Sequence, residues 1–343
     1  MSLAKEIAEQ PRVLARLLAE GAAEAQGIGA TLRDAEHLTI VARGSSDNAA
    51  TYGKYLFEGH AGLVTALAAP SLVTRYATPP EFGRGAVIGI SQSGAAPDVA
   101  EVLEVARDAG ARTIAITNVA RSRVARSANV VLGLRAGPER SIAATKTFTA
   151  TSLALALIAS GCAVARGRPA LSLTGLEEAL EEAVGLGAET AMLAARIGRA
   201  RSLVILGRGL VYPMALEAAL KVKELARVWA EPYSSADLAH GPIALLGPDT
   251  PAVVMSVRGL VEKDARDLAR KLRDRGVRVH AITNDERLAE SVDSAVLLRS
   301  QPHEAVAVIA LVVVAQLLAS DLARRRGLDP DRPKGLTKVT RTR

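Results

Sequence analysis

A short turn rich in Ser and Gly could bind an anion. The segment 87–90 is apolar, as in a buried parallel strand, and Ser91-Gln92-Ser93-Gly94 follows it directly. Pro97 and Asp98 then suit the first turn of a helix. Such a turn points backbone N–H groups, the positive end of the helix dipole and side-chain donors at one spot. This chemistry fits a phosphate group, but an ordinary strand-to-helix turn also favours Ser and Gly, so both interpretations stay open.

A second group of reactive side chains lies in the other half of the chain. Glu217, Lys221 and Glu224 are spaced i, i+4 and i+7, which places them on one face of a helix. A solvated charged face has the same spacing. The polar, turn-rich segment 231–242 follows and carries His240. A single histidine is more often structural, yet a carboxylate, an ammonium and an imidazole near a phosphate would supply what proton transfer on a sugar needs.

The elements that must position these groups alternate between apolar strands and helices. After a helical segment to about residue 35, we expect strands at 37–42, 62–67, 87–90, 111–117 and 129–134, and helices at about 49–58, 98–109 and 146–162. This alternation predicts parallel sheets with right-handed crossovers. Sites in such sheets lie beyond the carboxyl ends of the strands. Gly44–Asn48 and Ser91–Gly94 are therefore expected at the same edge of one sheet.

The second half of the chain repeats the order of the first. Gly110–Asn118 matches Gly276–Asn284 at an offset of 166 residues, and the strand ends Ala-Arg-Gly and Gly-Arg-Gly are offset by 165. The repeat predicts an α/β fold with two doubly wound, flavodoxin-like parallel-sheet domains. By the same offset Ser91–Gly94 corresponds to Ser256–Gly259, where only one serine remains. We therefore expect one phosphate site, in the first domain.

The expected domain organisation follows from this repeat. It comprises an N-terminal helical segment (1–35), a first domain with the phosphate site (36–170), a helical linker (171–200), a second domain (201–328) and a C-terminal tail (329–343). The apolar runs 153–165 and 305–319 are broken by Ser, Gly or Gln. We expect buried helices there and no membrane span.

Composition narrows the class of protein. Hydrophobic residues make up 49% and charged residues 23% of the 343 residues, which is typical of a soluble globular protein. The net charge of +7 is spread along the chain and aromatic residues are rare, which argues against a nucleic-acid partner. The single cysteine, Cys162, indicates a reducing compartment, so a cytoplasmic location is expected. The histidines show no ligand spacing, so no metal site is expected.

The motifs together resemble the sugar isomerase (SIS) family in its double-domain form. The matching stretches are Gly44-Ser45-Ser46, Ile90–Gly94, Ala143–Phe148, Ala215–Glu224, Ala230–Pro242 and Asp331–Lys338. Within this family the chain is similar to the isomerase half of the glucosamine-6-phosphate synthases. The resemblance extends from about residue 35 to the C-terminus.

The resemblance implies a sugar-phosphate substrate and a role for each matching residue. It assigns binding of the substrate and its phosphate to Gly44, Ser45, Ser46, Ser91, Gln92, Ser93, Glu139 and Ala143. Glu224 would move a proton between C1 and C2, assisted by Lys221. His240 would help to open the sugar ring and would reach the site of the neighbouring subunit of a homodimer. Lys338 would form a Schiff base with the open-chain sugar, and the tail would close over the substrate. No metal or organic cofactor is implied.

Several positions depart from the family pattern. Ala96 stands where the family turn often has threonine, and Ala144 where the synthases have serine. Arg43 stands where the synthases commonly have cysteine, and it could either replace the lost phosphate donor or simply pack. The sequence has no N-terminal glutaminase domain, and Cys162 lies deep in the chain. We therefore expect no release of ammonia from glutamine.

The hypothesis favoured by these features is a SIS-type glucosamine-6-phosphate deaminase. It would convert glucosamine 6-phosphate and water to fructose 6-phosphate and ammonia. Two alternatives of the same class are a fructosamine-6-phosphate deglycase and a synthase-like isomerase that uses free ammonia or a separate glutaminase. A non-catalytic sugar-phosphate sensor is the alternative of another class. A sensor would keep the phosphate site but would not need Lys221, Glu224 and His240.

Overall fold

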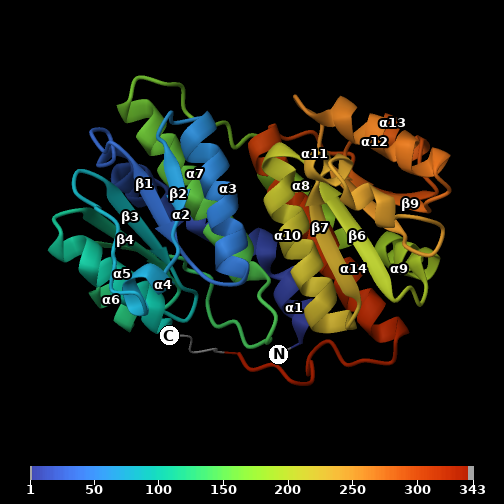
Figure 1. Cartoon of the computed structure of the whole chain (residues 1–343), viewed down its shortest axis with the longest axis horizontal. Helices are drawn as coiled ribbons and strands as arrows, with labels where there is room; N and C mark the ends of the chain where they lie inside the picture. Colours follow the sequence, from blue (N-terminus) through green and yellow to red (C-terminus); the bar gives the residue numbers. More distant parts are fainter. Residues whose placement is uncertain (1, 339–343) are drawn as a thin grey trace. The chain divides into compact units, whose positions relative to one another are not determined.

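The fold consists of two compact units, each built on one parallel sheet (Figure 1). The structure is a computed structural model and describes residues 2–338. The first unit contains Arg12–Glu139, Lys146–Leu171 and the tail residues Thr337 and Lys338. The second unit contains the chain up to Pro11, Arg140–Thr145 and Ser172–Leu336. Short segments of each half of the chain thus belong to the unit of the other half.

The first unit holds a five-stranded sheet in the order β2-β1-β3-β4-β5, with all strands parallel. Its strands are β1 (Leu38–Val41), β2 (Thr65–Leu67), β3 (Ala86–Ile90), β4 (Arg112–Thr117) and β5 (Val130–Gly133). Its helices are α2 (Gln10–Ala30, which starts in the second unit), α3 (Ser45–Gly59), α4 (Ser71–Thr74), α5 (Pro97–Asp108), α6 (Arg123–Arg126) and α7 (Lys146–Ala165). The chain leaves β1 toward β2 and leaves β3 in the opposite direction toward β4. Since crossovers between parallel strands are right-handed as a rule, this reversal assigns α3 and α5 to opposite faces of the sheet.

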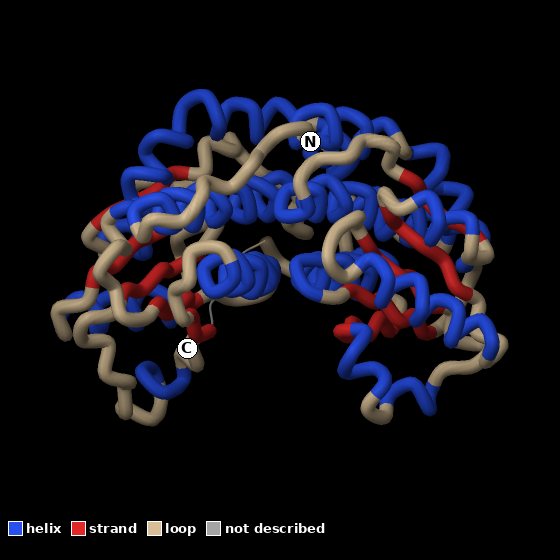
Figure 2. The backbone as a smooth tube through the Cα atoms, turned by 90° about the horizontal axis from the view of Figure 1, so that it is seen from above, coloured by secondary structure: helices blue, strands red, loops and turns tan. Residues whose placement is uncertain are grey.

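The second unit repeats this topology, with the strand order β10-β9-β8-β6-β7. Its strands are β6 (Ser202–Gly207), β7 (Trp229–Ser234), β8 (Ala252–Ser256), β9 (Val279–Thr283) and β10 (Ser294–Leu297). Its helical elements are α1 (Leu3–Ala8), α8 (Leu176–Gly185), α9 (Gly187–Ile197), η1 (Gly209–Val211), α10 (Tyr212–Lys221), η2 (Val222–Ala226), α11 (Ser235–Ala239), η3 (Pro242–Leu245), α12 (Glu262–Asp274), α13 (Glu286–Glu290) and α14 (Glu304–Arg325). In each unit, helices flank the strands on both sides (Figure 2). The predicted pair of doubly wound parallel sheets is confirmed.

The two longest apolar helices are core elements. Both α7 and α14 are long and apolar enough to cross a membrane, but 89% of the apolar window of each is buried inside the protein. In α7 the buried residues include Leu153, Leu155 and Leu157, so no single apolar face is set apart from a polar one. A helix that is apolar all round belongs in the centre of a layered domain. Both helices therefore match the buried helices expected from the sequence.

Two local predictions were wrong. Helix α3 begins at Ser45 rather than near residue 49, because Gly44 adopts a φ of +57° at its N-cap and lets the chain turn directly into the helix. The segment 231–234, expected to be a turn, is part of β7. Pro232 lacks an N–H group, but β7 is an edge strand that pairs only with β6, so no second ladder is broken.

Candidate functional site

The predicted phosphate turn lies where the first sheet reverses its strand order. Strands β1 and β3 are neighbours, and the chain leaves their carboxyl ends in opposite directions. Such a switch point is where open α/β sheets bind ligands. Ser45 and Ser46 form the first turn of α3 after β1, and Ser91–Gly94 follow β3. The structure thus brings the two predicted turns to one edge of the sheet.

The backbone carbonyls of the Ser91–Gly94 turn are fixed by hydrogen bonds from backbone N–H groups. The carbonyl of Ser91 accepts from Gly94 N–H at 3.0 Å, that of Gln92 from Asn118 N–H at 3.1 Å, and that of Gly94 from Val124 N–H at 3.1 Å. Gly94 has a φ of +64°, and a Cβ atom there would lie 2.0 Å from Ser122 Oγ. The turn therefore requires glycine. Because these carbonyl oxygens accept hydrogen bonds from backbone N–H groups, they are turned toward the protein and do not repel an anion bound at the turn.

The corresponding turn of the second unit is already filled. Its amide groups donate to the protein's own side chains: Arg258 N–H to Asn284 Oδ1 at 2.7 Å, Gly259 N–H to Glu262 Oε2 at 3.0 Å, and Leu260 N–H to Glu304 Oε2 at 3.4 Å. Two of these acceptors are carboxylates, which occupy the donors that a phosphate would use. This arrangement supports the expectation of a single phosphate site, in the first domain.

The cluster of Glu217 and Lys221 on α10 with Glu224 on η2 is largely buried and is not a solvated charged face. Lys221 Nζ lies 3.4 Å from Glu217 Oε1 and 2.5 Å from Glu224 Oε2. The side chains of Glu217 and Lys221 are 0% and 1% exposed, while that of Glu224 is 23% exposed. Burial lowers the pKa of Lys221, but the two carboxylates outweigh it, so the pKa lies above that of an ordinary lysine. Lys221 is therefore a cation at neutral pH, and Glu224 is the carboxylate of the cluster that solvent reaches.

Glu224 sits in an unusual stretch of helix. The α-helical hydrogen bonding ends at Lys221, and residues 222–226 form the π-helical turn η2. Single π-turns inside helices are frequent at functional sites. Arg227 then adopts a left-handed conformation with φ +52° and ends the helix, and its guanidinium donates to the carbonyl of Lys334 at 3.1 Å. The π-turn is a feature that the 3.6-residue spacing of the sequence did not predict.

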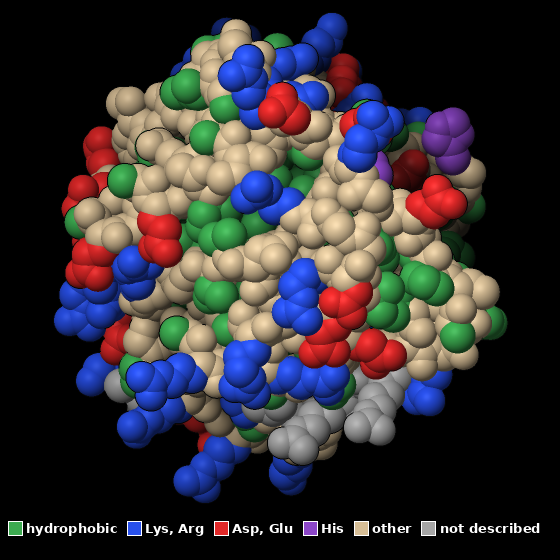
Figure 3. Space-filling view, turned by 90° about the vertical axis from the view of Figure 1, so that its left-hand side faces the viewer, with side chains coloured by type: hydrophobic (Ala, Val, Ile, Leu, Met, Phe, Trp, Pro, Cys, Tyr) green, Lys and Arg blue, Asp and Glu red, His purple; other side chains and the backbone are tan. Residues whose placement is uncertain are grey.

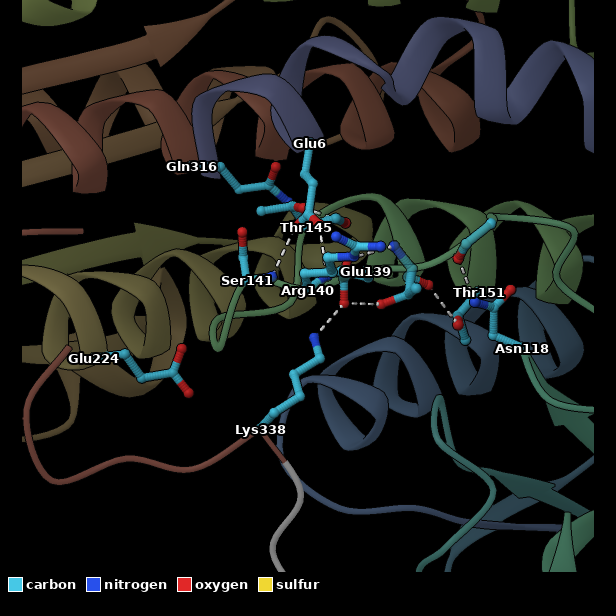
Figure 4. Close-up of polar contacts among 12 residues, drawn as sticks. Glu6, Asn118, Glu139, Arg140, Ser141, Thr145, Thr151, Glu224, Gln316 and Lys338 are labelled. Carbon is cyan, nitrogen blue, oxygen red and sulfur yellow. Dashed lines mark hydrogen bonds and ion pairs between the residues drawn. The ribbon is translucent and has the colours of Figure 1, made fainter. Parts of the chain in front are cut away.

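Lys338 and Glu139, both predicted site residues, form an ion pair in the first unit (Figure 4). Lys338 Nζ lies 2.8 Å from Glu139 Oε2, and the Glu139 side chain is 0% exposed. Thr147 fixes this carboxylate further, through its N–H at 3.1 Å and its hydroxyl at 2.7 Å. The sequence analysis did not single out Thr147, because its partner lies eight residues away across a loop.

The loop 140–145, which contains Ala143, belongs to the second unit. Glu6 of α1 is fully buried and accepts from Arg140 N–H at 2.6 Å and Ser141 N–H at 3.1 Å, as Figure 4 shows. Ala143 is buried. Nothing in the local sequence around Glu6 signalled this contact, which joins residues more than 130 positions apart. The side-chain carboxylate of Glu6, near the start of the chain, thus fixes the loop 140–145, which contains part of the family motif Ala143–Phe148.

His240 lies on the surface of the second unit. It is exposed, it follows the last residue of α11, and Gly241 next to it has a φ of +151°. The nearby Leu245 side chain is 79% exposed. The exposed position of His240 is compatible with the expectation that it acts in a neighbouring subunit, which stays a prediction. Figure 3 shows basic side chains in several separate groups on one face, with Asp and Glu among them.

The matches to known proteins define the class of this chain. The model of the SIS domain matches residues 31–161 and 196–324, so the chain belongs to the SIS domain family and carries two copies of the domain. The resemblance to this family that the sequence showed from about residue 35 onward is thus confirmed for both domains.

Similar proteins narrow the branch of the family. The chain is 37% identical over 350 residues to a glutamine–fructose-6-phosphate aminotransferase (isomerizing) of Gloeobacter violaceus, covering 97% of this chain and 57% of that protein. The chain thus spans about half the length of the curated relatives it matches. The C-terminal domain of glucosamine-fructose-6-phosphate aminotransferase from Francisella tularensis superposes with a TM-score of 0.87 at 28% identity, covering 96% of this chain and 98% of that chain. A glucosamine-6-phosphate deaminase from Thermotoga maritima shares the fold, with a TM-score of 0.75 at 24% identity over 100% of both chains.

Proposed function

We propose that this chain is an enzyme that deaminates glucosamine 6-phosphate, with water, to fructose 6-phosphate and ammonia. The observation that carries the proposal is the buried Glu217–Lys221–Glu224 cluster, of which only Glu224 is substantially exposed to solvent. A sensor would gain nothing from burying a lysine between two carboxylates, since burial of charged groups is costly. The filled turn of the second unit supports phosphate binding in the first domain only.

The reaction needs a proton to move between adjacent carbons. His240 would assist opening of the sugar ring, which exposes the C1 aldehyde. Glu224 would take the proton from C2 and return it to C1, which leaves an imine at C2. Water adds to C2, the C–N bond breaks, and ammonia leaves as the C2 ketone forms. Lys221 would hold the Glu224 carboxylate in place and stabilise negative charge that develops on the sugar oxygens.

Lys338 would act from the C-terminal tail. The family resemblance assigns to it a Schiff base with the open-chain sugar, and its ion pair with Glu139 supports a tail that is held in place. An amine must lose its proton before it attacks a carbonyl, so Lys338 would have to leave the Glu139 carboxylate or transfer a proton first. The tail would then shield the open-chain sugar from bulk solvent and contribute an amine.

The single cysteine favours water over glutamine as the partner of this chain. Cys162 is buried in α7, and burial raises the pKa of its thiol, so it is not poised to attack glutamine. If another polypeptide or segment supplies ammonia, the same residues could run the reaction toward glucosamine 6-phosphate. A buried, unpaired cysteine also fits a cytoplasmic location.

The test is incubation with glucosamine 6-phosphate while ammonia and fructose 6-phosphate are measured. We expect both products in equal amounts, and a loss of about 100-fold or more in kcat for Glu224→Gln. Lys223→Gln is the matched control, because Lys223 is exposed on the same helical turn. Absence of turnover by the wild-type chain, or full turnover by Glu224→Gln, would refute the proposal.

A substrate panel separates the alternatives. Turnover of fructosamine 6-phosphate adducts but not glucosamine 6-phosphate would indicate a deglycase. Formation of glucosamine 6-phosphate from fructose 6-phosphate only with added ammonia or a glutaminase would indicate a synthase-like isomerase. Calorimetric binding of sugar phosphates without any turnover would indicate a sensor.

The homodimer has its own test. If His240 acts in the neighbouring subunit, co-expressed His240→Ala and Glu224→Gln chains form hybrid dimers with one complete site, and activity returns. If mixing restores nothing, His240 works within its own subunit or not at all.

A further inference from the structure

Arg43 connects the two turns at the switch point of the first sheet. It directly precedes Gly44, and its Nε donates to Asp98 Oδ2 at 2.6 Å. The Asp98 side chain is 0% exposed and lies in the first turn of α5, two residues after Ala96. The guanidinium is therefore anchored at the N-terminus of α5, next to the position where the family turn often carries a threonine hydroxyl.

The anchor uses only one edge of the guanidinium. Among the described residues Arg43 makes no other side-chain hydrogen bond or ion pair, so Nη1 and Nη2 keep their N–H groups. The Arg43 side chain is 50% exposed, so these groups are accessible. The Nη1–Nη2 edge carries parallel N–H groups that match two phosphate oxygens.

The repeat provides an internal comparison. Arg208 occupies the corresponding position of the second unit, and it contacts Asp264 through Nη1 at 3.1 Å. Both of those side chains are more than 40% exposed, whereas Asp98 is fully buried. In the second unit, Arg208 thus uses a terminal nitrogen, Nη1, to contact its carboxylate partner. In the first unit, which has the proposed phosphate site, Arg43 contacts its partner through Nε, so Nη1 and Nη2 both remain available to a ligand.

The charge of Arg43 also acts on the first turn of α3. Burial raises the pKa of Asp47, and the Arg43 guanidinium opposes that rise. Asp47 lies directly after Ser46. The positive charge of Arg43 is therefore close to the N-termini of both α3 and α5.

We infer that Arg43 is a further phosphate ligand, which donates through Nη1 and Nη2 and replaces the hydroxyl that is absent at Ala96. This inference rests on the proposed function only in that the site holds the phosphate end of a sugar. Asp98 positions the guanidinium, and the ion pair keeps it oriented when the site is empty. Because the contact joins a cation and a phosphate dianion, its contribution to affinity falls as ionic strength rises.

The test compares the wild type with four variants: Arg43→Gln, Arg208→Gln, and Arg43→Gln combined with either Ala96→Thr or Asp98→Asn. Binding of fructose 6-phosphate is measured by calorimetry, together with KM and kcat for glucosamine 6-phosphate. Arg43→Gln keeps a donor for Asp98 but removes the charge and the parallel N–H groups. We expect its Kd and KM to rise about 10- to 100-fold, since hydrogen bonds to charged groups contribute about 1.5–3 kcal/mol, while kcat changes little. Arg208→Gln is the matched control and should bind like the wild type. Ala96→Thr added to Arg43→Gln should recover a large part of the lost affinity.

The outcomes separate this inference from the proposed function. If Arg43→Gln is folded, as judged by an unchanged melting temperature, and binds fructose 6-phosphate as tightly as the wild type, the inference is wrong. If affinity falls but Ala96→Thr restores nothing while Asp98→Asn does, Arg43 is a structural partner of Asp98 and the inference is also wrong. If the wild type itself binds no sugar phosphate, the proposed function fails first.

Discussion

His280 should make the stability of the second unit depend on pH. Its side chain is 2% exposed in β9, and its Nδ1 lies 2.8 Å from Ser294 Oγ on the neighbouring strand β10. Burial lowers the pKa of His280 from 6.5 to about 4. The positive charges of Arg278 and Arg196 lower this pKa further, and the carboxylate of Asp293 partly opposes the shift. The unfolded chain therefore binds the proton more tightly than the folded protein does.

The sign and size of the effect follow from linkage. Because the folded pKa is depressed, this contribution to stability is complete above about pH 6.5 and is lost as the pH falls toward 4. The full shift corresponds to about 3 kcal/mol at about 1.4 kcal/mol per pKa unit. Between pH 7.5 and pH 5.0, about 2 kcal/mol of it should disappear.

Urea denaturation at these two pH values measures the effect. Circular dichroism follows unfolding in this assay, because the single tryptophan, Trp229, is already 71% exposed in the folded protein. We compare the wild type with His280→Asn, which cannot titrate in this range. The wild type should lose about 2 kcal/mol more than the variant on acidification, whatever the substitution costs at pH 7.5. Equal losses in the two proteins would refute the argument that His280 is neutral because it is buried.

Three further predictions concern the site. Gly94→Ala should lower the free energy of unfolding by about 1–3 kcal/mol from its strained backbone alone, and by more because the new Cβ meets Ser122. Gly44→Ala has open space around the new Cβ and should show only the backbone cost. Urea titration compares the two variants. Lys221→Met should cost about 3–5 kcal/mol in the same assay, since it removes the cation that both carboxylates contact, and adding Glu217→Gln should recover part of that loss. Glu139→Gln should release the tail, so trypsin should cleave after Lys338 faster than in the wild type; an unchanged cleavage rate would contradict a tail held by this ion pair.

Much of the fold could be predicted from local patterns. Apolar runs bounded by turn residues gave most of the strands, and the repeat of Gly110–Asn118 at Gly276–Asn284 gave the second sheet. The position of Ser91–Gly94 followed from the rule that parallel strands end at one edge. These inferences succeed because strand and helix periodicity are properties of the backbone, which a sequence reports residue by residue.

Local patterns were insufficient where a neighbour in space decided the outcome. Residues 231–234 contain a proline and look like a turn, but they are part of β7, which tolerates Pro232 because an edge strand pairs on one side only. The spacing of Glu217, Lys221 and Glu224 predicted a shared face but could not tell a buried cluster from a solvated one. Burial against the rest of the second unit decided that, and with it the raised pKa of Lys221.

The sequence by itself determined the two-domain α/β architecture, the family and the residue types available for chemistry. Only the tertiary structure decided which of those residues meet: Arg43 with Asp98, 55 positions away, and Lys338 with Glu139, 199 positions away. It also decided that Glu262 and Glu304 fill the second turn. The physical reason is that pairing over such separations depends on the packing of whole elements and on the cost of burying unpaired charge, neither of which is encoded in a local spacing.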